Sequence, residues 1–136
     1  MVNQSSAARR MRLLGKNRED PKREERITME IIVDAYGSEE QAMGWYCYLE
    51  DKLHFPFAAE CIAHRSISPL KIGDEVEVVA MAPDDECGHE MFVKIRGKRC
   101  AQAVPLTQLV PAAGSDQPTR EAVEDWHYWL GRGYEL

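Results

Sequence analysis

Acidic side chains fall in short clusters along this sequence, and such clusters can bind cations. Asp84, Asp85, Glu86 and Glu90 bring four carboxylates into seven residues, and Gly88 between them allows a tight turn. Carboxylates held this close repel one another unless a cation or a proton neutralises them. Flexible loops of oxygen ligands suit Ca²⁺, which takes roughly six to eight oxygens. The loop therefore predicts a calcium site, and the alternative reading is a solvated acidic loop.

A second group of acids surrounds a predicted helix. Asp34 lies in the turn before it, Glu39 and Glu40 in its first turn, and Asp51 near its end. Acids in a first turn complement the helix dipole without any ligand, whereas Asp51 is disfavoured by the dipole and would gain from a cation. The predicted metal ligands are carboxylates of both segments: Asp34, Glu39, Glu40, Asp51, Asp84, Asp85, Glu86 and Glu90.

Other site chemistries find little support in the sequence. The spacing of an EF-hand loop is absent, so a calcium site must either be assembled from separate segments or be weaker and more solvated. Cys61 with His64, and Cys87 with His89, do not have the usual spacing of a zinc site. A strand-to-helix nucleophile elbow and a glycine-rich phosphate loop are also missing, and we predict that the protein is not an enzyme.

Charge is distributed unevenly along the chain. Residues 1–26 carry eight Lys and Arg against four acids, whereas the rest carries 19 Asp and Glu against nine Lys and Arg, a net charge of −10. An acidic body argues against binding to phosphate backbones, so we expect no nucleic-acid partner for it. We predict that residues 1–26 form a basic flexible arm, and that a protein partner, if one binds, does so through the barrel or through this arm.

The acidic clusters require elements that position them, and the first is a helix over 38–53. Ser38 is a suitable N-cap, with Gln41 three residues later. Ala42, Trp45 and Leu49 recur at spacings of three and four, which predicts one buried face.

Period-two patterns follow the helix and predict short antiparallel strands over residues 55–111. Their regular spacing, with a one-turn helix at 105–109, favours a small SH3-like β-barrel. Thr119 can cap a last helix over 119–130 after a linker. The predicted fold class is α+β: an SH3-like antiparallel barrel flanked by an N-terminal and a C-terminal helix, in one domain over 27–136.

Cysteine usage and hydropathy suggest a compartment. The four cysteines are widely spaced, residues 1–20 lack the apolar stretch of a secretory signal, and no run of 18 apolar residues occurs. We expect free thiols, a cytoplasmic protein and no membrane partner.

A set of short motifs over residues 26–136 carries a family resemblance. The motifs are Asp34-Ala35-Tyr36, Ala42-Met43-Gly44-Trp45-Tyr46, Leu49-Glu50-Asp51-Lys52-Leu53, Phe55-Pro56-Phe57, Ser68-Pro69-Leu70, Gly73-Asp74-Glu75-Val76, Asp85-Glu86-Cys87, His89-Glu90-Met91-Phe92-Val93, Val104-Pro105-Leu106, Asp125-Trp126-His127-Tyr128-Trp129 and Arg132-Gly133-Tyr134. Together they resemble the small cyanobacterial-type calcium-binding protein family, which has no EF-hand.

The resemblance implies a protein that binds Ca²⁺ and buffers or senses it in the cytoplasm. The acidic motif residues that it carries over are Asp34, Glu39, Glu40, Glu50, Asp51, Asp85, Glu86 and Glu90. The alternative hypothesis is an acidic SH3-like protein-interaction module that binds a basic partner and has no specific metal role. An interaction module would hold its partner whether or not calcium is chelated.

Overall fold

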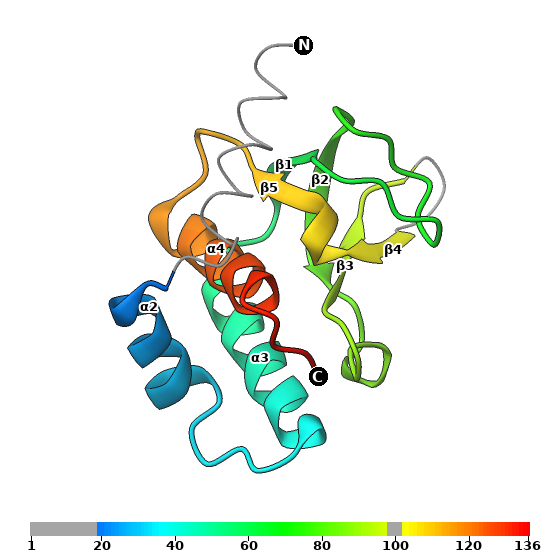
Figure 1. Ribbon diagram of the computed structural model, residues 1–136. Helices are drawn as coiled ribbons and strands as arrows, with labels where there is room; N and C mark the ends of the chain where they lie inside the picture. The colour runs from blue at the N-terminus through cyan, green and yellow to red at the C-terminus, as the bar shows by residue number, and fades with distance from the viewer. Residues whose placement is uncertain (1–18, 98–101) are drawn as a thin grey trace.

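The computed structural model describes residues 19–97 and 102–136 and has an α+β architecture. Figure 1 shows the helices gathered on one side and the strands on the other, with α3 and α4 side by side. The helices are α2 (Pro21–Arg26), α3 (Ser38–Lys52) and α4 (Gln117–Gly131), with short helical turns η1 (Ile27–Ile31), η2 (Asp84–Glu86) and η3 (Leu106–Gln108). None of the helices in these two ranges is long and apolar enough to cross a bilayer.

Five antiparallel strands form one sheet in the order β4-β3-β2-β1-β5. They are β1 (Phe57–Cys61), β2 (Glu75–Met81), β3 (Phe92–Ile95), β4 (Gln102–Pro105) and β5 (Leu109–Pro111). The edge strands β4 and β5 do not pair among the described residues, although only η3 separates them in the chain. The predicted barrel closure is therefore not confirmed: three-residue β5 pairs with β1 alone, and the sheet stays open.

Helix α3 agrees with its predicted range to within one residue and buries the expected face. Ala42, Trp45 and Leu49 are buried, joined by Tyr48. Its N-cap is Gly37 and not Ser38, which is already the first helical residue, and no side chain caps the start. The predicted capping by Ser38 is wrong because the helix begins one residue earlier.

Helix α4 (Gln117–Gly131) begins two residues before the start of the predicted range, 119–130. Asp116 is the N-cap, and its Oδ1 accepts a hydrogen bond from the Thr119 backbone N–H at 2.9 Å. Thr119 was predicted to be the cap, but its hydroxyl oxygen instead accepts from the His54 backbone N–H at 3.0 Å. Trp126 of α4 packs edge-on against Trp45 of α3, with ring centroids 5.0 Å apart, at the centre of the core.

Residues 21–26, predicted as part of the flexible arm, form α2 and pack on α4. Arg23 Nη1 and Arg26 Nη2 donate to Oδ1 of the fully buried Asp125 at 2.8 and 2.7 Å, and the Tyr48 hydroxyl donates to Oδ2 at 2.8 Å. Two guanidinium groups thus compensate one buried carboxylate and fix α2. The remainder of the predicted arm, residues 1–18, lies outside the described residues.

Candidate functional site

A pocket of about 380 Å³ lies between the first turns of α3 and the short turn η2. Three carboxylates, Glu39, Glu40 and Asp84, line it together with a mostly apolar set of residues: Ala42, Met43, Tyr46, Cys87 and Gly88. Helix α3 and η2 are more than 30 residues apart in sequence. The pocket therefore joins one acid from the predicted 84–90 loop with two acids from the predicted helix.

Two hydrogen bonds fix the walls of this pocket. The Tyr46 hydroxyl donates to the carbonyl oxygen of Ala82 at 2.7 Å, which ties α3 to the residue two positions before Asp84. Glu40 Oε1 accepts from the Tyr36 backbone N–H at 3.0 Å and holds the loop that enters α3. These contacts orient the two acidic segments toward the same space.

Cys87 anchors the other end of the η2 turn. Its side chain is buried, and its Sγ accepts from the Phe92 backbone N–H at 3.4 Å. Burial raises the pKa of the Cys87 thiol, and the charges of Glu86 and Asp84 raise it further, against a lowering effect of the Phe92 backbone. Burial also raises the pKa of Tyr46, with added contributions from nearby negative charges that include Asp84. A neutral thiol and a neutral phenol thus border the carboxylates.

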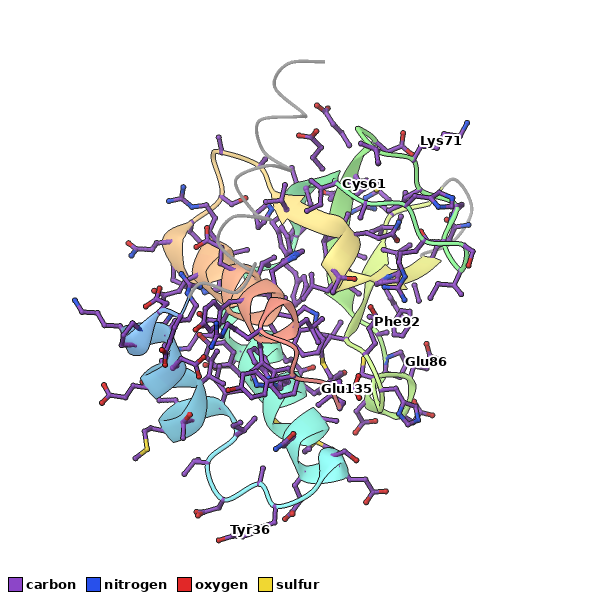
Figure 2. The ribbon with its side chains drawn as sticks, in the orientation of Figure 1. Tyr36, Cys61, Lys71, Glu86, Phe92 and Glu135 are labelled. Atoms are coloured by element: carbon purple, nitrogen blue, oxygen red, sulfur yellow. The ribbon has the colours of Figure 1, made fainter. Side chains whose placement is uncertain are left out.

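The structure leaves the other predicted ligands outside the pocket lining. Asp85 and Glu86 belong to the same η2 turn; Figure 2 labels Glu86 there. Asp34 lies in the loop before α3 with a left-handed φ of 59°. Asp51 follows Glu39 by twelve residues on one helix, a rise of about 18 Å, so both cannot ligate one ion.

Glu90 was predicted as a ligand because of its acidic neighbours, but the fold gives it a cationic partner. Its two carboxylate oxygens accept from Arg65 Nη1 and Nη2 at 2.6 and 2.8 Å, and the Thr107 hydroxyl donates to it at 3.1 Å. By contrast, none of the ion pairs in the described parts of the chain involves the pocket acids or their neighbours in η2, which are Glu39, Glu40, Asp84, Asp85 and Glu86.

The donor set of the pocket fits a hard cation. Its charged ligands are carboxylates, and Cys87, the one thiol among its lining residues, is held neutral by burial. Within residues 19–97 and 102–136, no three acidic, histidine or cysteine side chains stand close enough together to hold a metal ion. A bound ion would therefore bring the α3 and η2 acids closer and complete its shell with water and backbone carbonyls.

Three residues that line the pocket were not predicted from the sequence. Met43, Tyr46 and Cys87 were not among the predicted site residues, but they line the pocket beside the acids. Tyr46 lies one residue after Trp45 and off the main helical stripe. That offset position was the one signal that could have set it apart.

Comparisons with known proteins agree with this chemistry. A family model described as "Calcium binding", of the CcbP type, matches residues 25–130. The crystal structure of Anabaena CcbP has a TM-score of 0.77 and 42% identity, covering 88% of this chain and 97% of that one. A structure titled as a calcium-binding protein in the calcium-binding form has a TM-score of 0.76 and 43% identity, covering 87% and 96%.

No curated protein sequence matches the chain. The family model nevertheless spans more than half of the 136 residues, and both structural relatives are aligned over nearly their whole length. The protein therefore belongs to the CcbP family of calcium-binding proteins, which are not enzymes.

Proposed function

We propose that the pocket between α3 and η2 is the calcium site, with Glu39, Glu40 and Asp84 as its charged ligands. The observation that carries this proposal is that three acids from two distant segments line one pocket and have no ion-pair partner among the described residues. Their mutual repulsion is relieved when Ca²⁺ binds. The calcium-bound relative, at 43% identity, supports the same ligand.

We further propose that the protein senses calcium in the cytoplasm and does not merely buffer it. The ligands lie on a fifteen-residue helix and on a three-residue turn, so binding must draw one toward the other. The η2 turn connects β2 to β3, and its displacement would reach the sheet. The buried thiols of Cys61 and Cys87, neither in a disulfide, support a reducing compartment.

Calorimetric titration of chelator-stripped protein with Ca²⁺, in excess Mg²⁺, tests the site. We expect the native chain to bind with a Kd between about 10⁻⁷ and 10⁻⁵ M, the range of calcium sensors. Glu39→Gln with Asp84→Asn should weaken binding at least about tenfold, because the charge of the ligand set controls affinity. The matched control, Asp51→Asn with Glu75→Gln, removes the same charge outside the pocket and should leave the Kd nearly unchanged.

Two further readouts locate the ion. The pair Asp85→Asn and Glu86→Gln shows whether the outer acids of η2 take part, and Tb³⁺ luminescence sensitised by Tyr46 reports a cation in the pocket itself. Equal weakening by the pocket pair and the control pair would indicate diffuse attraction and move the site elsewhere. Loss of Tb³⁺ emission in Tyr46→Phe, at a Tb³⁺ concentration that saturates the variant and with the Trp residues unchanged, would place the ion beside that ring.

A second candidate function is the acidic interaction module. Met43 is 49% exposed beside the carboxylates, which gives the pocket an apolar surface that an ion does not need. The strand order, with η3 between β4 and β5, supports an SH3-like arrangement of the open sheet. A protein partner retained equally with calcium and with a chelator would favour this function.

A further inference from the structure

The surface around the pocket combines negative charge with exposed apolar side chains. Glu39, Glu40 and Asp84 lie beside Met43, and Tyr36, 88% exposed, precedes α3 and donates its backbone N–H to Glu40. Figure 2 shows Tyr36 at the far tip of the loop that leads into α3. A segment that is both basic and apolar matches such a surface better than a free cation does.

The chain itself contains one segment of this composition. Residues 1–18 hold five cationic side chains, no acid, and large apolar side chains between them: Arg9, Arg10, Met11, Arg12, Leu13, Leu14, Lys16 and Arg18. This segment precedes residue 25, where the family match begins. The Anabaena structure is covered over 97% of its length by 88% of this chain, so most of the unmatched residues belong to this chain. The family fold does not require the segment.

Residues 1–18 are long enough to reach the pocket from α2, where the chain is attached to α4. Asp20 donates its backbone N–H to the Tyr128 hydroxyl at 2.9 Å, and Arg23 pairs with buried Asp125, so the described part of the chain is attached to α4 from Asp20 onward. Eighteen residues can extend roughly 60 Å. A chain of 136 residues has a radius of gyration of about 14 Å, so the whole surface is within reach.

Some other acids of the body attract a cation less than the pocket acids do, because they are already paired. Glu77, Glu90 and Asp125 already pair with Arg96, Arg65 and Arg23 respectively. A cation that approached these acids would have to displace an existing partner. Glu39, Glu40 and Asp84 form no ion pair with the described cations, so a cation that reaches the pocket displaces no partner there.

We propose that residues 1–18 bind the pocket between α3 and η2 when Ca²⁺ is absent and compete with the ion for it. This inference rests on the proposed calcium site and assigns that site a regulator within the same chain. Arg side chains neutralise the carboxylates while Met11, Leu13 and Leu14 cover Met43 and Tyr36. Because coupling is reciprocal, Ca²⁺ releases the segment and the segment raises the apparent Kd for Ca²⁺.

The first test compares calcium affinity among three proteins. These are the full chain, a variant that lacks residues 1–18, and a full-length variant with all five cations replaced (R9Q/R10Q/R12Q/K16Q/R18Q). Both variants should bind Ca²⁺ about fivefold or more tightly than the native chain at low salt. The difference should shrink above about 0.5 M salt, where screening weakens the contact. Equal affinities at low salt would overturn the proposal.

The second test separates docking from long-range attraction. A synthetic peptide of residues 1–18 is added to the shortened protein, and NMR follows the backbone amides of residues 36–46 and 82–88. We expect shifts confined to these residues, reversal by Ca²⁺, and no shifts with a peptide carrying five Gln. Two results would contradict competition at this pocket. The first is a change in calcium affinity when residues 1–18 are deleted, without peptide-induced amide shifts at the pocket. The second is peptide-induced amide shifts at the pocket that Ca²⁺ does not reverse.

The same measurements distinguish this inference from the calcium site. If Glu39→Gln with Asp84→Asn leaves calcium binding intact in the shortened protein, the proposed site is wrong, whatever the peptide does. If that pair abolishes calcium binding but the peptide binds nowhere, the site stands and the competition fails. Calcium binding by the variants therefore tests the proposed site, and peptide binding tests whether residues 1–18 occupy it.

Discussion

Tyr46 is the side chain that joins the two halves of the proposed site. Its ring lines the pocket, and its hydroxyl donates to Ala82 just before the η2 acids. Cys87 holds the end of the same turn through Phe92. Asp84 therefore lies between two anchored positions, although its own carboxylate accepts no hydrogen bond among the described contacts.

Replacing Tyr46 by Phe should lower both stability and calcium affinity. The Ala82 carbonyl oxygen loses its donor, which costs about 0.5–1.5 kcal/mol, and η2 is less firmly placed relative to α3. We expect a reduced Tm and a severalfold weaker Kd for Ca²⁺. Tyr128→Phe is the matched control, because it removes a hydroxyl that donates to Glu24 far from the pocket. An equal loss of calcium affinity in the control would show that Tyr46 acts only through global stability.

At the scale of elements, the close approach of η1 to α3 depends on Gly44. A Cβ at this position would lie 2.3 Å from the carbonyl oxygen of Ile31, which is backbone and cannot move aside as a side chain can. Ile27 and Ile31 of η1 are buried against the core. The η1 turn, Ile27–Ile31, thus places both of its buried isoleucines against the core.

Gly44→Ala should therefore destabilise the protein although alanine favours helices. The backbone clash costs about 1–3 kcal/mol, and the gain in helix propensity offsets up to about 1 kcal/mol of it. A net loss of about 1–2 kcal/mol should appear in urea denaturation. Gly114→Ala is the control, since a Cβ there meets no atom within 4 Å. A Gly44→Ala variant as stable as the native chain would mean that η1 moves away from α3 without penalty.

At the scale of the whole molecule, His127 connects the helices to the sheet. Its Nε2 donates to the carbonyl oxygen of Leu109 in β5 at 2.9 Å, so the ring carries its proton on this nitrogen in the neutral form. Burial lowers the pKa of His127, and the hydrogen bond to Leu109 only partly opposes this shift. The folded state thus binds fewer protons at this site than the unfolded state does.

The folded protein should lose stability as the pH falls below about 6.5, the ordinary pKa of histidine. The pKa of His127 is lower in the folded state than in the unfolded state. The stability that neutral His127 contributes is therefore fully present above the unfolded-state pKa, and it is lost as the pH falls toward the folded-state pKa. His127→Gln keeps a donor for Leu109 but cannot titrate. Between pH 7.5 and 5.5, the Tm of His127→Gln should change less than the Tm of the native chain. Plots of Tm against pH that run parallel for the two proteins would disprove the role of His127.

The sequence by itself determined the elements whose signals are local. The apolar spacing of Ala42, Trp45 and Leu49 predicted α3 to within one residue, and period-two patterns predicted short strands over 55–111, where β1 to β5 lie. The acidic motifs and their resemblance to a calcium-binding family agree with the family match. These features depend on residues that are neighbours in the chain, so spacing alone reveals them.

The tertiary structure decided which acids stand together and which are already paired. Glu90 lies in the acidic loop, yet Arg65, 25 residues away, compensates it, while Asp84 lines the same pocket as Glu39 and Glu40. Asp125 likewise orders α2, and a three-residue β5 leaves the sheet open. Charge compensation and sheet closure depend on contacts between distant segments, and the spacing of residues along the chain does not contain those contacts.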